Sequence, residues 1–305
     1  MRHLVLRLAR RLYRLAMRVD RSQVRLFRRI PSRWKRSALR VAFRLAGPLL
    51  PASVSAQGVR LAAPRSHLFG FVLQPHEPEI VAVLDRLLGP GMTAVDVGAN
   101  IGYLTLQMAR RVGPGGRVVA IEPAADNLAW LRRNVALNGF ENVEIHAAGA
   151  GAEERERELH LEEGSTRYGF YGGGSEAQTV AVREVPLDGV VDGPADLVKI
   201  DVEGAEIEVL AGMQRLLADS PRLKLIVEWN PPLLERAGRR SEELVEVLSA
   251  HGFTLHLIGT GGALEPLVPS DATRVARAAR ERRSTWHGNL LAERRGTSSS
   301  ASAAP

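Results

Sequence analysis

The stretch from Thr93 to Leu106 (TAVDVGANIGYLTL) constrains the fold of this chain more than any other part of it. It opens with an apolar run that carries one acid, Asp96, near its end. Gly98 and Gly102 follow, and an apolar pattern with helical spacing begins after them. This order predicts a buried strand, a tight glycine turn and the start of a helix. Glycine permits turn geometries that other residues resist, and it lets a ligand approach the backbone closely.

A second apolar segment, Arg117 to Glu122 (RVVAIE), also ends in an acid. An acid at the tip of the strand after a glycine turn, about twenty residues further on, is positioned to bind a ribose diol. We therefore expect Glu122 to hold a ribose, and we expect a nucleoside-containing cofactor on an open α/β sheet.

The charge near the glycine turn indicates which cofactor this is. The glycine spacing departs from the G-x-G-x-x-G pattern that binds a pyrophosphate, and Asp96 precedes the turn. A carboxylate repels a pyrophosphate and attracts a cation. S-adenosylmethionine carries a sulfonium and an ammonium and no phosphate, so we expect it rather than NAD. The alternative is an ordinary α/β turn without a ligand, which leaves the spacing to Glu122 as coincidence.

Charge is distributed unevenly along the 305 residues. Residues 1–50 hold 15 basic residues and one acid, whereas the remainder has a net charge of −7. A general affinity for nucleic acid therefore does not follow from the net charge of +7. The chain has no cysteine, which excludes disulfides and thiolate chemistry.

The N-terminal segment has the pattern of a basic amphipathic helix. Leucines and a valine form one stripe, and arginines cover the opposite face: Leu4, Leu8, Leu12, Leu15 and Val19 against Arg7, Arg10, Arg11, Arg14, Arg18 and Arg21. No apolar run approaches the ~20 residues of a membrane span. We expect a cytoplasmic protein whose residues 1–30 contact the membrane surface as a peripheral element. Contact with a partner protein, nucleic-acid binding and organelle targeting are the alternatives.

The chain divides into four parts by composition and pattern. We expect a basic helical extension over residues 1–50, a linker over 51–64, one α/β domain over 65–293 and a disordered tail over 294–305. Strands and helices alternate from residue 92 onward, which predicts a largely parallel sheet. Residues 126–138 and 204–217 are predicted helices, and residues 153–163 and 178–185 are a predicted hairpin pair. The glycine-rich loop between the last two (164–175) is either a lid or disordered.

Several motifs in order resemble the FkbM-type family of class I S-adenosylmethionine-dependent methyltransferases. They are VDVGANIGYLT (95–105), AIEP (120–123), VPLDGV (185–190), VKIDVEGAEIEVLAGM (198–213), LIVEWNP (225–231) and GNLLA (288–292). The resemblance implies a Rossmann-like α/β fold, with a seven-stranded, mostly parallel sheet, helices on both faces and an antiparallel last strand. It also implies methyl transfer, usually to a hydroxyl oxygen of a sugar or other small metabolite.

The resemblance assigns roles by position. It implies that Asp96, Gly98, Asn100 and Gly102 form the cofactor loop, that Glu122 binds the ribose, and that Asp201 lies beside the reaction centre. Glu77 is expected to approach the methionine end of the cofactor.

The acceptor hydroxyl is a weak nucleophile, so a general base is expected. The candidates are Asp201, Glu203, Glu206 and Glu228, because acids at the carboxyl ends of strands lie where open α/β sheets bind ligands. Of these, we expect Asp201, Glu228 or Glu203 to be catalytic. The alternatives are that Glu203 caps a helix, with Glu206, and that Asp201 holds the cofactor's ammonium. A divalent metal between these acids is also conceivable, but we expect no metal site.

The leading hypothesis is O-methylation of a glycan or small metabolite. An RNA or protein methyltransferase that uses the basic segment is the second, and the acidic body of the chain disfavours nucleic acid as a partner. A catalytically inactive methyltransferase-like binding module is the third, and the intact cofactor loop disfavours it.

Overall fold

The computed structural model describes residues 51–64, 68, 71, 76–161, 168–171, 178–281 and 288–294. The chain divides into two compact units, Met1–Glu77 and Pro78–Pro305. In the first unit, β1 (Val54–Ala56) and β2 (Val59–Leu61) form a short antiparallel hairpin. The predicted basic helical extension and the predicted tail beyond Arg294 lie outside the described residues.

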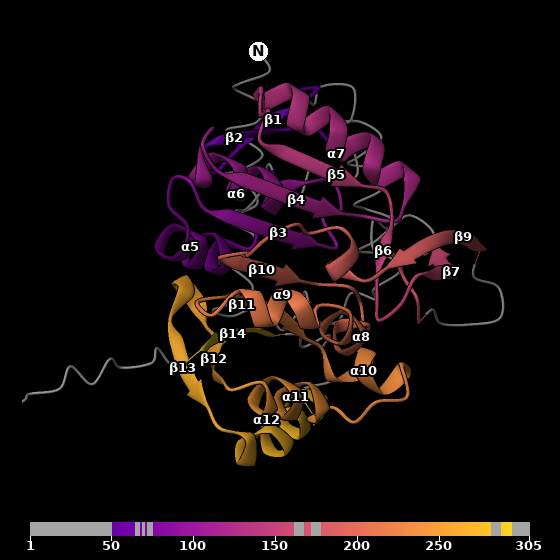
Figure 1. Cartoon of the computed structure of the whole chain (residues 1–305), viewed down its shortest axis with the longest axis vertical. Helices are drawn as coiled ribbons and strands as arrows, with labels where there is room; N and C mark the ends of the chain where they lie inside the picture. Colours follow the sequence, from indigo (N-terminus) through magenta and orange to yellow (C-terminus); the bar gives the residue numbers. More distant parts are fainter. Residues whose placement is uncertain are drawn as a thin grey trace, which may run out of the picture. The chain divides into compact units, whose positions relative to one another are not determined.

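The second unit is built on an eight-stranded sheet in the order β13-β12-β14-β11-β10-β3-β4-β5 (Figure 1). Its strands are β3 (Thr93–Val97), β4 (Arg117–Ile121), β5 (Val143–His146), β10 (Leu197–Ile200), β11 (Lys224–Trp229), β12 (Phe253–Ile258), β13 (Leu264–Leu267) and β14 (Gly288–Arg294). The first five of these are mutually parallel, and β14 runs antiparallel to β11 and β12. The Rossmann-like α/β fold with an antiparallel last strand is thus confirmed.

The sheet has one strand more than the seven expected. The added strand, β13, pairs antiparallel with β12 at the edge of the sheet. Its sequence, LEPL, contains a proline, and three of its four residues face solvent. Proline within an apolar run argues against a strand except at a sheet edge. The sequence therefore has no clear strand pattern at this short edge strand.

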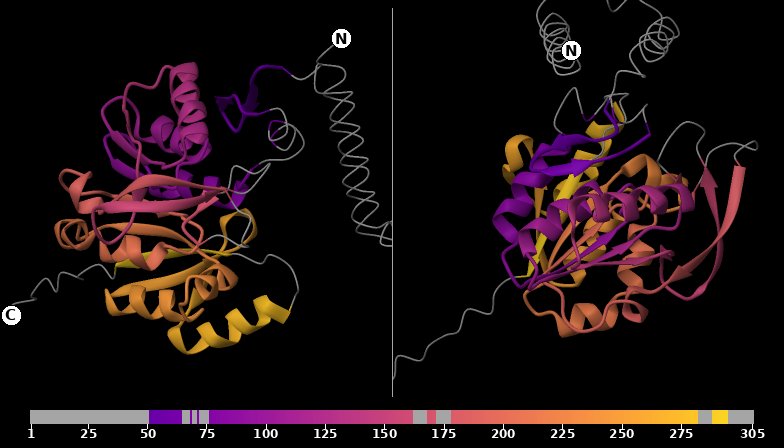
Figure 2. Two further views of the ribbon diagram at one scale, coloured as in Figure 1. Left: turned by 90° about the vertical axis from the view of Figure 1, so that its right-hand side faces the viewer. Right: turned by 90° about the horizontal axis from the view of Figure 1, so that it is seen from above.

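Helices cover both faces of the sheet (Figures 1 and 2). They are α5 (Pro78–Leu87), α6 (Tyr103–Val112), α7 (Ala125–Asn138), α8 (Glu206–Ala211), α9 (Gln214–Asp219), α10 (Pro231–Arg236), α11 (Glu243–Ala250) and α12 (Pro269–Glu281), with 3-10 turns η2 (Leu187–Gly189) and η3 (Thr260–Gly262). Val95 and Val97 of β3 share a buried core with Leu248 of α11. Asp96, between them, contacts Thr105 of α6 on the opposite face. Because side chains alternate along β3, successive residues pack against helices on opposite faces of the sheet.

The predicted single helix over residues 204–217 is interrupted. α8 ends at Ala211 and α9 begins at Gln214. A Cβ on Gly212 would lie 1.9 Å from the carbonyl oxygen of Gly151, so two backbone segments meet there. The break between α8 and α9 lies at this close approach, which a periodic apolar pattern does not reveal.

A second, four-stranded sheet has the order β6-β9-β7-β8. Its strands are β6 (Gly149–Ala150), β7 (Arg155–Leu161), β8 (Tyr168–Gly169) and β9 (Gln178–Val185). The antiparallel pairing of β7 with β9 confirms the predicted hairpin pair. Leu159 of β7 and Phe170, which follows β8, form a small buried cluster with Ala124 and Ala205, which follow β4 and β10. The second sheet therefore packs at the carboxyl end of the main sheet (Figure 1). The glycine-rich loop, for which a lid and disorder were the two alternatives, lies mostly outside the described residues.

Candidate functional site

The glycine turn after β3 is held against the ends of two neighbouring strands. The backbone N–H groups of Gly98 and Ala99 both donate to the carbonyl oxygen of Ile121, each over 3.0 Å. Gly98 and Gly102 have positive φ angles of 77° and 92°. A Cβ on Gly98 would lie 1.9 Å from the carbonyl oxygen of Asp201 at the end of β10. Both the backbone conformation and the close approach therefore require glycine at position 98.

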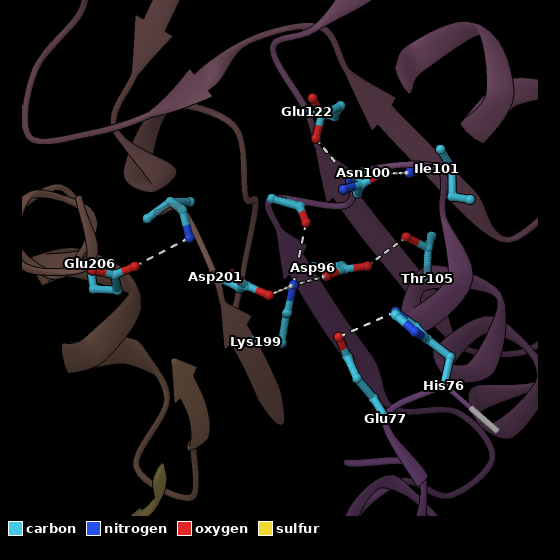
Figure 3. Close-up of polar contacts among 12 residues, drawn as sticks. His76, Glu77, Asp96, Asn100, Ile101, Thr105, Glu122, Lys199, Asp201 and Glu206 are labelled. Atoms are coloured by element: carbon cyan, nitrogen blue, oxygen red, sulfur yellow. Dashed lines mark hydrogen bonds and ion pairs between the residues drawn. The ribbon is translucent and has the colours of Figure 1, made fainter. Parts of the chain in front are cut away.

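Glu122 ties this turn to the loop after β4. The residue is 4% exposed. Its Oε2 accepts the backbone N–H of Asn100 at 2.8 Å (Figure 3). Its Oε1 accepts the N–H of Ala124 and the side-chain amide of Asn127. Burial raises the pKa of Glu122, and these hydrogen bonds oppose the shift. Because a carboxylate offers about four acceptor positions, the three donors leave room for a ligand hydroxyl.

Asp96 is fully buried beneath the turn. Thr105 Oγ1 donates to Asp96 Oδ2 over 2.6 Å, and Lys199 Nζ lies 3.6 Å from Oδ1 (Figure 3). The cation that faces Asp96 is thus a lysine of the chain itself. That Asp96 also attracts a cationic cofactor stays a prediction.

Lys199 is a site residue that the sequence analysis missed. It lies in β10 and is 5% exposed. Its Nζ lies 3.3 Å from Asp201 Oδ2 and donates to the carbonyl oxygen of Gly98 over 3.3 Å. Lys199 pairs in register with Asp96 of β3, so both side chains lie on the same face of the sheet. The available signal was a lysine inside an apolar strand, two residues before an acid.

The loop after β10 presents Asp201 and buries Glu206. The Asp201 side chain is 29% exposed. Glu206, at the start of α8, is fully buried, and its Oε1 accepts the backbone N–H groups of Val202 and Gly204. Burial raises the pKa of Glu206 to about 7. Glu206 therefore shapes the loop from which Asp201 projects.

Glu228 lies near the end of β11 and is 8% exposed. Burial raises its pKa well above the usual range, and the negative charges of Asp201, Glu206 and Glu203 add to the shift. Within the described part of the chain, Glu228 Oε2 and Glu206 Oε2 have no hydrogen-bond partner. The three predicted catalytic acids thus influence one another at the same edge of the sheet.

Positive φ angles mark several of the predicted residues. Among the described residues, the non-glycine residues with positive φ are Gln57, Glu77, Asn100 and Glu203. This conformation costs an L-residue about 1–2 kcal/mol, and such strain clusters at functional sites. Glu77 belongs to the first unit, where its Oε1 lies 3.5 Å from the Nε2 of the neighbouring His76. Its approach to the cofactor stays a prediction.

The residues around the turn suit a cationic nucleoside ligand. Asp96, Glu122 and Asp201 supply three carboxyl groups, and Lys199 supplies one ammonium. The carboxylates disfavour a pyrophosphate, whereas Glu122 keeps an acceptor position for a hydroxyl. A side chain at position 98 would clash with the end of β10 and prevent the contact between the turn and that strand. Within the described residues, no group of three or more histidine, cysteine or acidic side chains is arranged to hold a metal ion.

Comparison with known proteins identifies the family. Residues 96–255 match the model of the methyltransferase FkbM domain, which is more than half of the chain. The chain belongs to the FkbM methyltransferase family. The family resemblance read from the sequence motifs is therefore confirmed.

Individual relatives match parts of this chain in sequence. Methyltransferase 1 of Beauveria bassiana is 30% identical over 149 residues, which are 39% of this chain and 57% of that protein. Methyltransferase sdnD of Sordaria araneosa is 30% identical over 172 residues, 45% of this chain and 66% of that protein. The chain thus spans less than two thirds of either relative. A solved FkbM methyltransferase structure from Methylobacillus flagellatus is 20% identical, with a TM-score of 0.41, and the match covers 76% of this chain and 56% of that one.

Family membership makes S-adenosylmethionine the cofactor of this FkbM domain. The residues described above fit it, since they combine an acidic surrounding with a free acceptor position on Glu122. In this assignment Glu122 holds a ribose hydroxyl, and the turn from Gly98 to Gly102 contacts the cofactor through its backbone. These individual residue roles are proposals.

Proposed function

We propose that this protein transfers the methyl group of S-adenosylmethionine to a hydroxyl oxygen of a sugar, glycan or small metabolite. The observation that carries the proposal is the position of Asp201. Its partly exposed carboxylate follows β10, beside the Gly98 turn. Open α/β sheets bind ligands beyond the carboxyl ends of their strands, so an acceptor hydroxyl and the cofactor loop meet at this residue.

The bound cofactor supplies a methyl carbon that its sulfonium has already activated. The protein then has to align the acceptor oxygen, exclude water and remove a proton. In this proposal Asp201 takes the hydroxyl proton as the new O–C bond forms and the bond between that carbon and the sulfonium breaks. The Asp201 side chain is 29% exposed, whereas Glu206 and Glu228 at this edge are buried, and Lys199 pairs with its carboxylate.

Glu228 and Glu203 have different roles in this proposal. Burial and nearby negative charge favour the neutral form of Glu228, so it donates a hydrogen bond rather than taking the acceptor proton. Glu203 lies against the second sheet, since a Cβ on Gly169 would come within 3.0 Å of Glu203 Cβ. Its positive φ turns the chain there. Glu203 is thus a contact that positions β8.

The second sheet supports water exclusion. Phe170 is 8% exposed and Leu159 is 1% exposed, and both pack with Ala124 and Ala205 at the strand ends. Apolar cover at this edge lowers the local dielectric constant and strengthens the interactions of the acids below it.

Labelled S-adenosylmethionine offered with sugars, lipid-linked glycans, small hydroxylated metabolites, RNA and protein tests this function. We expect label in a hydroxyl acceptor, and we expect Asp201→Asn to lower turnover by about 10²-fold or more. Asp192→Asn removes an exposed acid at the other end of β10 and serves as the matched control. Label in RNA or protein alone would overturn the acceptor class, and unchanged turnover in Asp201→Asn would overturn the base.

We also propose that the N-terminal segment holds the enzyme at an anionic membrane surface, where a lipid-linked glycan would be available. This proposal is supported by the arginine and leucine pattern of residues 1–30. Among the described residues, no helix is both long enough and apolar enough to span a bilayer.

A further inference from the structure

We propose that Lys199 is a positioning residue for methyl transfer and that it acts through Asp201. The inference rests on the proposed function and deepens it, because it assigns a role to a buried cation beneath the proposed base. Lys199 holds the Asp201 carboxylate in a fixed orientation and ties the end of β10 to the glycine turn.

The Lys199 ammonium contacts three segments at once. Its Nζ lies 3.6 Å from Asp96 Oδ1 in β3, 3.3 Å from the carbonyl oxygen of Gly98 in the turn, and 3.3 Å from Asp201 Oδ2 after β10 (Figure 3). A lysine ammonium has three N–H donors. One donates to the Gly98 carbonyl oxygen, and the two carboxylate oxygens lie within ion-pair distance of Nζ. The geometry is that of a junction between the two strands rather than of a surface ion pair.

Because Lys199 and Asp96 are buried, removing either of these charges is costly to stability. The Lys199 side chain is 6% exposed and that of Asp96 is 0% exposed, whereas that of Asp201 is 29% exposed. Removing one member of a buried ion pair leaves an uncompensated charge, which is strongly unfavourable. Buried Asp96 therefore holds the Lys199 ammonium in place, and Lys199 in turn holds the partly exposed carboxylate of Asp201.

Lys199 is also the positive charge among the acids at this edge. The titratable groups that face it or its partners are Asp96, Glu122, Asp201, Glu203, Glu206 and Glu228. The positive charge of Lys199 lowers the pKa of both Glu122 and Glu228, against the effect of burial. Without it, Asp201 would lose the cation that pairs with its carboxylate and would still face these acids.

The contact also selects one oxygen of Asp201. Because Oδ2 pairs with Lys199, Oδ1 is the oxygen left for a ligand. The carbonyl oxygen of Asp201 is close enough to the turn that Gly98 has no room for a Cβ. A shift of either segment would therefore move the proposed base relative to the cofactor loop, and Lys199 restrains both.

A double-mutant cycle tests this coupling. Lys199→Met, Asp201→Asn and the double variant are made in the full chain, with Lys199→Arg as the conservative variant. Lys224→Met is the matched control, since Lys224 begins the neighbouring β11 at the opposite end of the sheet. Turnover, the KM for S-adenosylmethionine and the urea unfolding midpoint are measured for each protein.

We expect Lys199→Met to lower kcat by about 10- to 100-fold, with less than about a threefold change in KM for the cofactor. In the Asp201→Asn background the same change should lower kcat less than about twofold, because the residue through which it acts is gone. Lys199→Arg should recover part of the loss, and Lys224→Met should behave as wild type. Additive losses in kcat would overturn the proposal.

Unfolding supplies a readout that needs no acceptor. The midpoint change of Lys199→Met should be smaller in the Asp201→Asn background than in the wild type, and equal changes would overturn the pairing. If Lys199→Met fails to fold, the Asp96→Asn, Lys199→Met double variant removes both buried charges, and the cycle is run on that protein. Failure of the wild type to bind S-adenosylhomocysteine would instead contradict the proposed function and leave the unfolding coupling as the test of Lys199.

Discussion

The backbone N–H of Asn100 donates to Glu122 Oε2 over 2.8 Å. This hydrogen bond joins the glycine turn after β3 to the acid at the end of β4. Ile121 reinforces the connection, because its carbonyl oxygen accepts from Gly98 and Ala99. Two motifs that lie apart in the sequence therefore form one structural unit. A substitution in either motif should alter the structure of both.

Gly98→Ala should be strongly destabilising. The added Cβ would lie 1.9 Å from the carbonyl oxygen of Asp201, at a φ of 77° that disfavours a side chain. We expect a loss of at least about 2 kcal/mol of unfolding free energy. Urea denaturation measures it. Gly89→Ala is the control, because nothing lies within 4 Å of a Cβ at position 89; equal stability of the two variants would contradict this account of the turn.

Glu206 should make stability depend on pH. Its pKa rises from 4.5 to about 7 on folding, so the folded state binds more protons than the unfolded state between these values. The stability from the protonated form is therefore complete below pH 4.5 and is lost as pH rises through about 7. Between pH 5 and pH 8 the loss is roughly 2–3 kcal/mol.

Glu206→Gln tests this pH dependence, because the amide keeps an oxygen for the N–H groups of Val202 and Gly204. Urea denaturation at pH 5 and pH 8 should show a fall in stability for the wild type that is smaller in the variant by the amount above. Glu156→Gln, on an exposed position of β7, should behave as wild type. The prediction fails if Glu206→Gln and the wild type lose the same stability.

The arginines of the N-terminal segment should govern binding to anionic vesicles. Each contributes about 1 kcal/mol near an anionic surface, so replacing Arg7, Arg11, Arg14 and Arg18 together by glutamine should weaken binding at least about tenfold. Co-sedimentation with vesicles of mixed phosphatidylserine and phosphatidylcholine measures this. Pure phosphatidylcholine vesicles are the control, and equal binding of both proteins to the anionic vesicles would count against membrane attachment.

Much of the fold follows from local patterns in the sequence. The strand, glycine turn and helix over Thr93–Leu106 appear as β3, the turn and α6. The helix predicted for residues 126–138 is α7, which ends with Gly139 in the left-handed conformation. These elements were predictable because apolar periodicity and glycine stops act over a few neighbouring residues.

Features that depend on contacts between distant segments were not predictable from the sequence. The break after Ala211 depends on the approach of Gly151 to Gly212. The importance of Lys199 depends on its register with Asp96 across two strands. The sequence also presents Glu228 as one acid among several, whereas burial near the end of β11 sets its protonation. Each of these features requires the pairing of strands to be known first.

Calorimetric titration of the full chain with S-adenosylhomocysteine, alongside Glu122→Ala, tests the central claim most directly. The account predicts a micromolar dissociation constant for the wild type and at least about a tenfold loss in Glu122→Ala, since a hydrogen bond to a charged group contributes about 1.5–3 kcal/mol. Glu141→Ala, an exposed acid after α7, should bind as the wild type does. Absence of binding by the folded wild-type protein would contradict the account.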